Sequence, residues 1–317
     1  MKKTFLFSLS LVALMVGCSK GNTTENKPLK IIAPVGAPAY AFYNEYNNEN
    51  FETNAVPKNI IAQMTSSSEN DIVVIDTTSG IQAINNGAPY KIASTITFGN
   101  FYIASTGNDE NTTMESDDKI ILFGQGQTPD KIFHYLYGND FDANIEYVAA
   151  ASDAAACLVS GKNVATGSSV DYVFLAQPAL QVALSNQNAA TYGKASIYES
   201  IQEKYETKNE GKKMMQASVF VKNTANKESV NTFLGKLKTS ITSLLETPTL
   251  LSSTVGTLEL DVQKTKFGAP AAVVQAVTTK GNQLGLGYLE AFANKEAIDT
   301  FLGLFNIQQT NEEIYYK

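Results

Sequence analysis

The sequence predicts an α/β protein made of two lobes. Apolar, strand-like segments run repeatedly into short polar turns and then into helix-like segments, an order that implies parallel sheets flanked by helices. After an N-terminal segment of 17 residues, about 300 residues remain, which is more than one compact core usually holds. We therefore expect two α/β lobes, each with its own sheet.

The first residues indicate export from the cytoplasm. Two lysines precede an apolar run, Phe5 to Val16, which is shorter than the roughly 20 apolar residues that a membrane-spanning helix needs. The small residues up to Cys18 resemble a bacterial lipoprotein lipobox, which implies cleavage before the cysteine and a lipid, palmitate included, on its thiol. We expect a signal peptide at 1–17, a lipid anchor at Cys18 and a polar tether at 18–28. An ordinary secretory peptide is the alternative.

The predicted first lobe begins after the tether. Residues 29–35 have a strand-like apolar pattern, and residues 36–38 then open a helix that reaches Tyr46, because proline suits a first helical turn. Residues 71–75 form a nearly continuous apolar strand, typical of a sheet that is buried on both faces. A polar turn at 76–80 and a helix over 81–85 follow this strand.

Three further strand, turn and helix units fill the middle of the chain. Ligands of such folds bind beyond the carboxyl ends of the strands, where N–H groups of helix N-termini converge. The turns of these units are therefore candidate binding segments. The units are strand 119–123 with turn 124–130 and helix 131–136, strand 145–148 with turn 149–153 and helix 154–160, and strand 172–175 with turn 176–178 and helix 179–184.

Two strands are expected to connect the lobes. The strand 98–105 ends in a polar stretch, and the strand 217–221 follows a charged segment. From Lys227 onward the apolar residues recur at helical spacing. We predict that lobe 1 comprises 29–104 plus 222–317, and that lobe 2, comprising 105–221, is inserted into it.

Charge and residue types exclude several classes of function. The formal net charge of −7 argues against a nucleic-acid partner. All 24 basic residues are lysines, so no guanidinium can clamp an anion in a bidentate manner. Cys157 fits a small buried hydrophobe, and His134 fits a helix-packing residue. We predict no metal site, no cofactor and no catalytic residue.

Polar side chains at three strand ends are candidate contacts for a solute. Hydroxyl, amide and carboxyl groups at these positions can face a ligand, whereas the alternative is that they only cap the following helices. The candidates are Thr77, Thr78 and Ser79 after strand 71–75, Gln127 and Thr128 after strand 119–123, and Ser152 and Asp153 after strand 145–148.

Aromatic residues near the expected cleft could stack on a planar solute. Tyr40, Tyr43, Phe98 and Tyr102 lie in the first predicted helix or in the first connecting strand. Aromatic side chains in such elements also serve as core residues, which is the alternative. We keep Tyr40 and Tyr102 as candidates.

Several short segments, taken in their order along the chain, resemble a known family. The chain is similar to solute-binding lipoproteins of ABC importers, in the NMT1/THI5-like and SsuA-like branch of the type 2 periplasmic-binding-protein fold. The resemblance spans almost the whole chain after the signal peptide. The matching segments are 34–38, 86–91, 98–102, 126–130, 158–162, 176–178, 285–288 and the helix 295–304.

The resemblance implies two Rossmann-like lobes joined by two crossing strands, with a ligand cleft between them. It also implies that Gly36, Ala37, Asn100, Gln177 and Asn282 lie at the solute. Relatives often have Glu at the Gln177 turn, and Arg near Asn282. Because this chain has neither, we expect a neutral or weakly charged, ring-bearing solute.

We therefore predict an extracytoplasmic, lipid-anchored and monomeric binding protein. It captures a small solute, closes around it and presents it to an ABC permease without chemistry. One alternative is an enzyme of the pyrimidine-synthesis type with the same fold. The other is a surface lipoprotein that serves adhesion or scaffolding.

Overall fold

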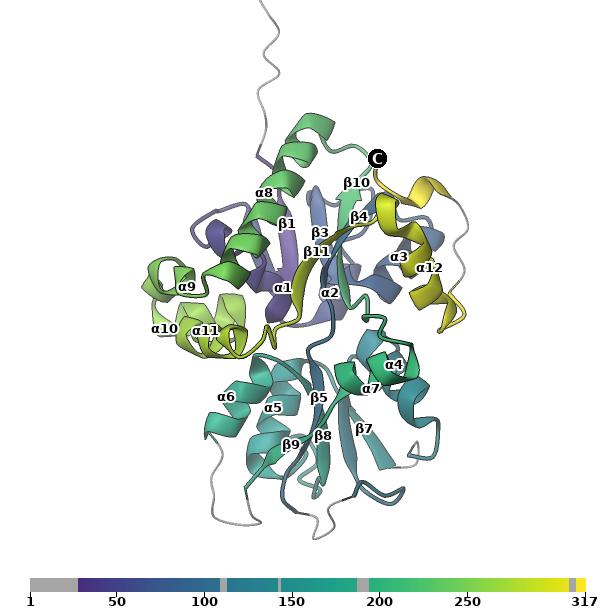
Figure 1. Cartoon of the computed structure of the whole chain (residues 1–317), viewed down its shortest axis with the longest axis vertical. Coiled ribbons are helices and arrows are strands. Elements are labelled where there is room, and N and C mark those ends of the chain that lie inside the picture. Colours follow the sequence, from purple (N-terminus) through teal and green to yellow (C-terminus); the bar gives the residue numbers. More distant parts are fainter. Residues whose placement is uncertain (1–27, 109–112, 142–143, 187–193, 308–311) are drawn as a thin grey trace, which may run out of the picture.

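Two β-sheets, each flanked by helices, build the two lobes of the computed structural model (Figure 1). The structure describes residues 28–108, 113–141, 144–186, 194–307 and 312–317. The predicted signal peptide and Cys18 lie outside the described residues. The α/β class and the two-lobe organisation that we predicted are confirmed.

The sheet of lobe 1 has six strands. β3 lies near its middle and is buried from Ile72 to Ile75, as its continuous apolar sequence predicts. β1, β2 and β3 are parallel, whereas β10 runs antiparallel to β3 and β4. In spatial order the strands are β11 (Leu286–Glu290), β4 (Tyr90–Thr97), β10 (Ala217–Lys222), β3 (Ile72–Asp76), β1 (Ile31–Pro34) and β2 (Phe51–Asn54).

The sheet of lobe 2 has five strands. β6, β7 and β8 are parallel, and β5 runs antiparallel to β8 and β9. In spatial order the strands are β7 (Ile145–Val148), β6 (Ile120–Phe123), β8 (Tyr172–Ala176), β5 (Phe101–Ser105) and β9 (Ser196–Ser200).

Both sheets are thus mixed, which corrects the expectation of parallel sheets. The parallel strands of each lobe point their carboxyl ends at the other lobe. A strand that enters a lobe from that side must run the opposite way, and β5 and β10 do so. The direction of β5 and β10 is therefore a consequence of inserting one lobe into the other.

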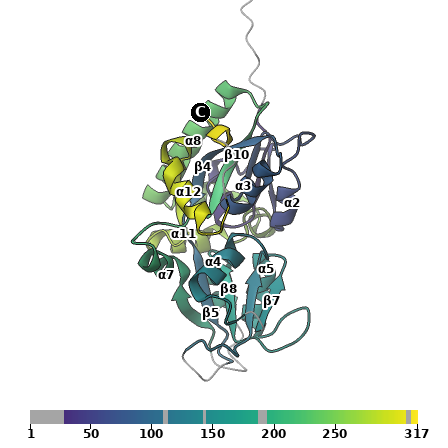
Figure 2. The ribbon, with the colours of Figure 1, turned by 90° about the vertical axis from the view of Figure 1, so that its right-hand side faces the viewer.

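The same two strands correct the lobe boundaries. β5 pairs only within the lobe 2 sheet and β10 only within the lobe 1 sheet. The chain therefore crosses between the lobes at 98–100 and again at 209–216, rather than at 104/105 and 221/222. Figures 1 and 2 both show the two crossings side by side between the lobes.

Helices cover both sheets, and three of them, α3, α4 and α5, begin earlier than predicted. The turn 76–80, for example, is the first turn of α3, because the Asp76 carboxylate accepts a hydrogen bond from Ser79 N. Lobe 1 holds α1 (Ala37–Tyr40), α2 (Pro57–Ile61), α3 (Thr77–Asn85), α8 (Lys227–Glu246), α9 (Leu250–Ser253), α10 (Leu260–Val262), α11 (Ala271–Thr279) and α12 (Lys295–Gly303). Lobe 2 holds α4 (Thr128–Tyr137), α5 (Ala151–Ser160), α6 (Ala179–Asn186) and α7 (Ile201–Lys208).

Aromatic side chains pack between the lobes. Phe301 of α12 lies 6.3 Å from Tyr205 of α7, measured between ring centroids. Phe305, just beyond α12, lies 6.2 Å from Tyr135 of α4. Figure 2 shows α12 above α7 on this side of the molecule. The contacts join the last helix of lobe 1 to two helices of lobe 2 and restrain the angle between the lobes.

Two sequence interpretations concern single residues outside the cleft. Cys157 is buried in α5, which confirms the core role, and burial raises the pKa of its thiol. His134 is half-buried on α4, with Nδ1 2.9 Å from Asp130 O and its ring against Phe133. Within the described ranges, no helix combines the length and the apolar character that crossing a bilayer requires.

Two glycine-to-alanine variants should change stability in opposite directions. A Cβ atom on Gly80 of α3 would lie 2.1 Å from a ring atom of Phe220, which is itself fully buried. We expect Gly80→Ala to lower the free energy of unfolding by about 1–3 kcal/mol through overpacking. Gly235 of α8 has nothing within 4 Å of such an atom, so Gly235→Ala should raise it by up to about 1 kcal/mol. Urea unfolding measures both, and stabilisation by Gly80→Ala would contradict the packing of α3 on β10.

Candidate ligand-binding cleft

A cleft of about 460 Å³ lies between the lobes, within the range of roughly 300–1,000 Å³ typical of small-molecule sites. Lobe 1 contributes the ends of β1 and β3, the start of α1 and the segment before α11. Lobe 2 contributes the ends of β6 and β8 and the starts of α4, α5 and α6. The turns predicted from the sequence therefore meet at one place. A solute of this size would touch both lobes at once.

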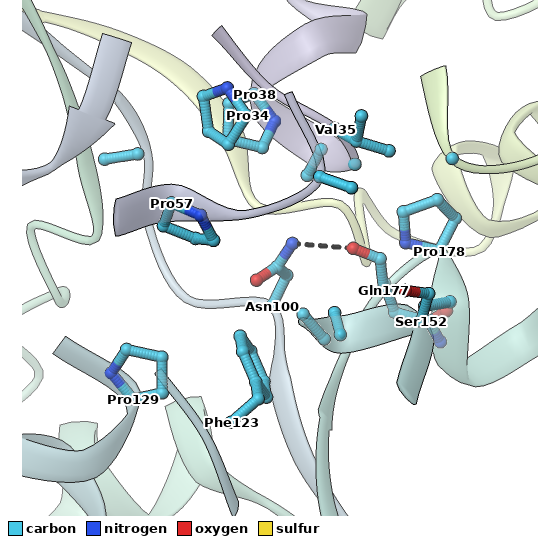
Figure 3. Close-up of a pocket in the computed structure, with 18 of the residues that line it drawn as sticks. Pro34, Val35, Pro38, Pro57, Asn100, Phe123, Pro129, Ser152, Gln177 and Pro178 are labelled. Carbon is cyan, nitrogen blue, oxygen red and sulfur yellow. Dashed lines mark hydrogen bonds between the residues drawn. The ribbon is translucent and has the colours of Figure 1, made fainter. Parts of the chain in front are cut away.

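Proline rings form much of the wall. Figure 3 shows Pro34, Pro38 and Pro57 of lobe 1 on one side of the cleft, and Pro129 with Phe123 of lobe 2 on the other. Proline presents an apolar ring and has no N–H donor. The wall therefore suits an apolar body and leaves polar recognition to a few groups.

The turn from β1 into α1 depends on Gly36. Its φ of 111° lies in a region that side-chain-bearing residues rarely adopt. Gly36 N donates to Phe267 O at 3.2 Å, which fixes the turn against the segment before α11. Gly36 and Ala37 of this turn line the cleft.

Two buried amide side chains, those of Asn100 and Gln216, and the backbone carbonyl of Gln177 form a hydrogen-bonded group at the floor of the cleft. Gln216 Oε1 accepts hydrogen bonds from the N–H groups of Gly99 and Asn100, both at 3.1 Å. Gln216 Nε2 donates to Asn100 Oδ1 at 2.6 Å. Asn100 Nδ2 in turn donates to Gln177 O at 2.9 Å, the dashed line of Figure 3. We call these three residues the hinge amides; they connect both crossings to the turn after β8.

Asp76 is the acidic residue of the cleft. Its Oδ1 accepts hydrogen bonds from Thr78 Oγ1, Ser79 N and Thr128 Oγ1, each at 2.9 Å. Its other oxygen, Oδ2, is buried and has no hydrogen-bond partner. Because Thr128 belongs to lobe 2, one carboxylate oxygen of Asp76 bonds both lobes while the other is unpaired.

Lys131 of α4 interacts electrostatically with Asp76. Lys131 of α4 donates to Gly126 O. Burial lowers the pKa of Lys131, and the negative charges of Asp76 and Asp130 oppose this shift. Lys264, which does line the cleft, is exposed.

Six of the predicted residues line the cleft and remain our candidates for solute contact. Asn100 and Gln177 are fully buried at its floor, and Ser152 is exposed at the start of α5. The six are Gly36, Ala37, Asn100, Gln127, Ser152 and Gln177.

The structure places the remaining hydroxyl and carboxyl candidates outside the lining, where each has a local partner. Thr78 and Thr128 bond to Asp76 and lie 3.1 Å apart across the lobes. Thr77 Oγ1 lies 2.7 Å from Ser218 Oγ on β10. Ser79 N donates a hydrogen bond to the capping carboxylate of Asp76. Asp153 Oδ2 accepts a hydrogen bond from Ala150 N at 3.2 Å. These residues therefore cap helices or pack within the protein, which was the alternative given for them above.

The other three candidates lie further away. Tyr40 is buried in the lobe 1 core, where its hydroxyl donates to Ala269 O at 2.6 Å and burial raises its pKa. Tyr102 and Asn282 line a different hollow of about 570 Å³, between α7 and the segment before β11. There Asn282 Nδ2 donates to Leu286 O at 2.8 Å.

Sequence reasoning missed four polar residues of the lining, Asp76, Gln216, Lys264 and Thr265. Asp76 could have been found, since it is the last residue of β3 and directly precedes the hydroxyl residues that we chose. Gln216 precedes a strand instead of following one, and Lys264 reaches the cleft from a late segment. No local pattern marks these two positions.

Comparisons with known proteins support the architecture. A structure described as an ABC transporter from Parabacteroides distasonis is 20% identical, with 90% of this chain and 94% of that chain covered and a TM-score of 0.63. The ligand-binding component of an ABC-type import system from Staphylococcus aureus, with zinc bound, is 10% identical, with coverages of 91% and 96% and a TM-score of 0.63. The periplasmic aliphatic sulphonate-binding protein SsuA from Escherichia coli is 12% identical, with coverages of 92% and 93% and a TM-score of 0.57.

At these identities the comparisons show a shared fold. No family model matches the chain, and no curated protein matches it. The predicted two-lobed architecture is confirmed over nearly the whole length of the chain and of each of these three structures.

Removing the hinge glutamine should destabilise the protein. Gln216→Ala leaves Gly99 N, Asn100 N and Asn100 Oδ1 without their partner in a buried place. We expect the free energy of unfolding in urea to fall by about 1–3 kcal/mol. Gln63→Ala, at an exposed glutamine, is the matched control and should stay within about 0.5 kcal/mol. Equal effects of the two substitutions would contradict a structural role for the hinge amides.

Proposed function

We propose that this chain, which has the type 2 periplasmic-binding-protein fold, is a solute-binding lipoprotein that delivers a small organic solute to an ABC permease. The observation that carries the proposal is the origin of the cleft lining. Both lobes supply it, and the hinge amides lie at its floor. A bound solute would therefore contact both lobes beside the hinge.

Such a site couples binding to lobe closure. A ligand shifts an open–closed equilibrium only by the difference in its affinity for the two states. A solute between the two proline-lined walls gains contacts with both lobes only in the closed state. Closure would then present a distinct surface to a permease.

The fold neighbours support this role. One is described as the ligand-binding component of an ABC-type import system, and another as a periplasmic sulphonate-binding protein. Cys157 and His134, which could in principle pair as nucleophile and base, do not line the cleft. We therefore favour binding without chemistry.

Cell-surface attachment is part of the proposal. The N-terminal residues support a removable signal, a lipid on Cys18 and a tether over 18–28. The described body would then be held at the extracytoplasmic face of the cell membrane through that lipid.

A blocked cleft should abolish capture of the solute. Ala151, half-buried at the start of α5, lines the cleft, so the ring in Ala151→Phe would occupy the solute's space. The purified protein is incubated with an extract of its own cells, and retained small molecules are identified by native mass spectrometry. We expect the unaltered chain to retain a compound and Ala151→Phe to lose it. Ala165→Phe, at an exposed alanine, is the control; retention by Ala151→Phe would contradict binding in the cleft.

The lipid anchor has a separate test. We expect Cys18→Ala to remove incorporation of labelled palmitate and to shift the protein from the membrane fraction to the soluble fraction. Cys157→Ala should change neither, because that thiol is buried. A Cys18→Ala protein that stays in the membrane fraction would overturn the lipoprotein assignment.

A further inference from the structure

Two residues of the cleft each leave a buried polar atom without a hydrogen-bond partner. These atoms are Asp76 Oδ2 and Gln177 Nε2. An unpaired polar atom in a buried place costs on the order of 1–3 kcal/mol. A solute that pairs with both atoms would recover that cost, so the two atoms describe the polar groups of the solute.

The unpaired Asp76 Oδ2 can accept a hydrogen bond from a donor on the solute. Asp76 Oδ1 already accepts three hydrogen bonds, one of them from the N-terminus of α3. An ionised carboxylate only accepts hydrogen bonds. Oδ2 therefore suits an N–H group, neutral or cationic, on the solute.

The unpaired Gln177 Nε2 can donate a hydrogen bond to an acceptor on the solute. The residue is only 1% exposed, and its Oε1 accepts from Gln181 N at 3.2 Å, which orients the side-chain amide. Nε2 is then left as a donor. The starts of α5 and α6 lie in the same wall, and their partial positive charge also favours an acceptor oxygen.

A sulfonate fits this arrangement poorly. Its three oxygens are acceptors, so it would leave Asp76 Oδ2 unpaired and place like charges together. The chain has no arginine to compensate, and Lys264 is exposed to solvent, where an ion pair contributes little.

Building on the proposed function, we infer that the solute is a net-neutral compound with an apolar body. It carries an N–H donor that bonds Asp76 Oδ2 in lobe 1 and a carbonyl or carboxylate oxygen that bonds Gln177 Nε2 in lobe 2. The solute class thus differs from that named for the sulphonate-binding neighbours. The two polar ends make the solute a bridge between the lobes.

Calorimetric titration with phenyl compounds of matched size tests the class. The probes are phenylacetamide and phenylalanine, which carry both groups, phenethylamine, which lacks the acceptor, and phenylmethanesulfonate. We expect one of the first two to bind at least about tenfold more tightly than the amine and the sulfonate, the factor that one hydrogen bond to a buried or charged group supplies. The sulfonate as the tightest probe, or no binding by the first two, would overturn the inference.

Two isosteric variants assign the groups to their partners. Asp76→Asn keeps an oxygen for the helix cap, and Gln177→Glu keeps an oxygen for Gln181 N, so both should fold. Each substitution should lower the affinity for the tightest-binding probe by about tenfold or more. Asp71→Asn makes the same charge change just before the start of β3, where Asp71 bonds Lys30 N, and should change affinity less than twofold.

The outcomes separate this inference from the proposed function. If the cell extract yields a solute that Ala151→Phe cannot retain, but that solute has no N–H group or binds both isosteric variants unchanged, the inference fails and the function stands. If neither the probes nor the extract gives cleft binding, both fail.

Discussion

The hydrogen bonds among Gln216, Asn100 and Gln177 are the constraint on which the arrangement of the two lobes depends. The chain passes between the lobes twice. Gln216, in the second crossing, makes three hydrogen bonds to Gly99 and Asn100 in the first crossing. Asn100 then bonds the turn after β8. The two crossings are therefore fixed to each other and to lobe 2.

The topology that this hinge requires also builds the cleft. Strands β5 and β10 leave the hinge in opposite directions, so the parallel strands of both lobes end at the hinge side and their helices begin there. The proline-lined walls supply apolar contact, and Asp76 and Gln177 supply two unpaired atoms on opposite lobes. Aromatic packing of α12 on α7 restrains the lobes on one side. In the proposed function, solute recognition and lobe closure would therefore depend on the same few residues.

Local sequence patterns predicted the elements, and tertiary contacts decided the rest. The apolar strand β3 and the helices α4 and α5 could be read from runs of residues near one another. The sheet to which β5 belongs could not, since pairing with β8 across more than 60 residues of chain decides it. In the site, Asp76 and the hydroxyls after it share one local signal, and only the fold shows that Asp76 lines the cleft while Thr78 and Thr128 bond to its carboxylate. Gln216 lies before a strand, so a search of the turns that follow the carboxyl ends of strands could not select it.

The most direct test of this account is a crystal structure of the protein with the solute that it captures from its own cells. We predict density for the solute between the starts of α1 and α5, with a nitrogen within hydrogen-bond distance of Asp76 Oδ2 and an oxygen within that distance of Gln177 Nε2. Density in the hollow between Tyr102 and Asn282, with the cleft holding water alone, would contradict it.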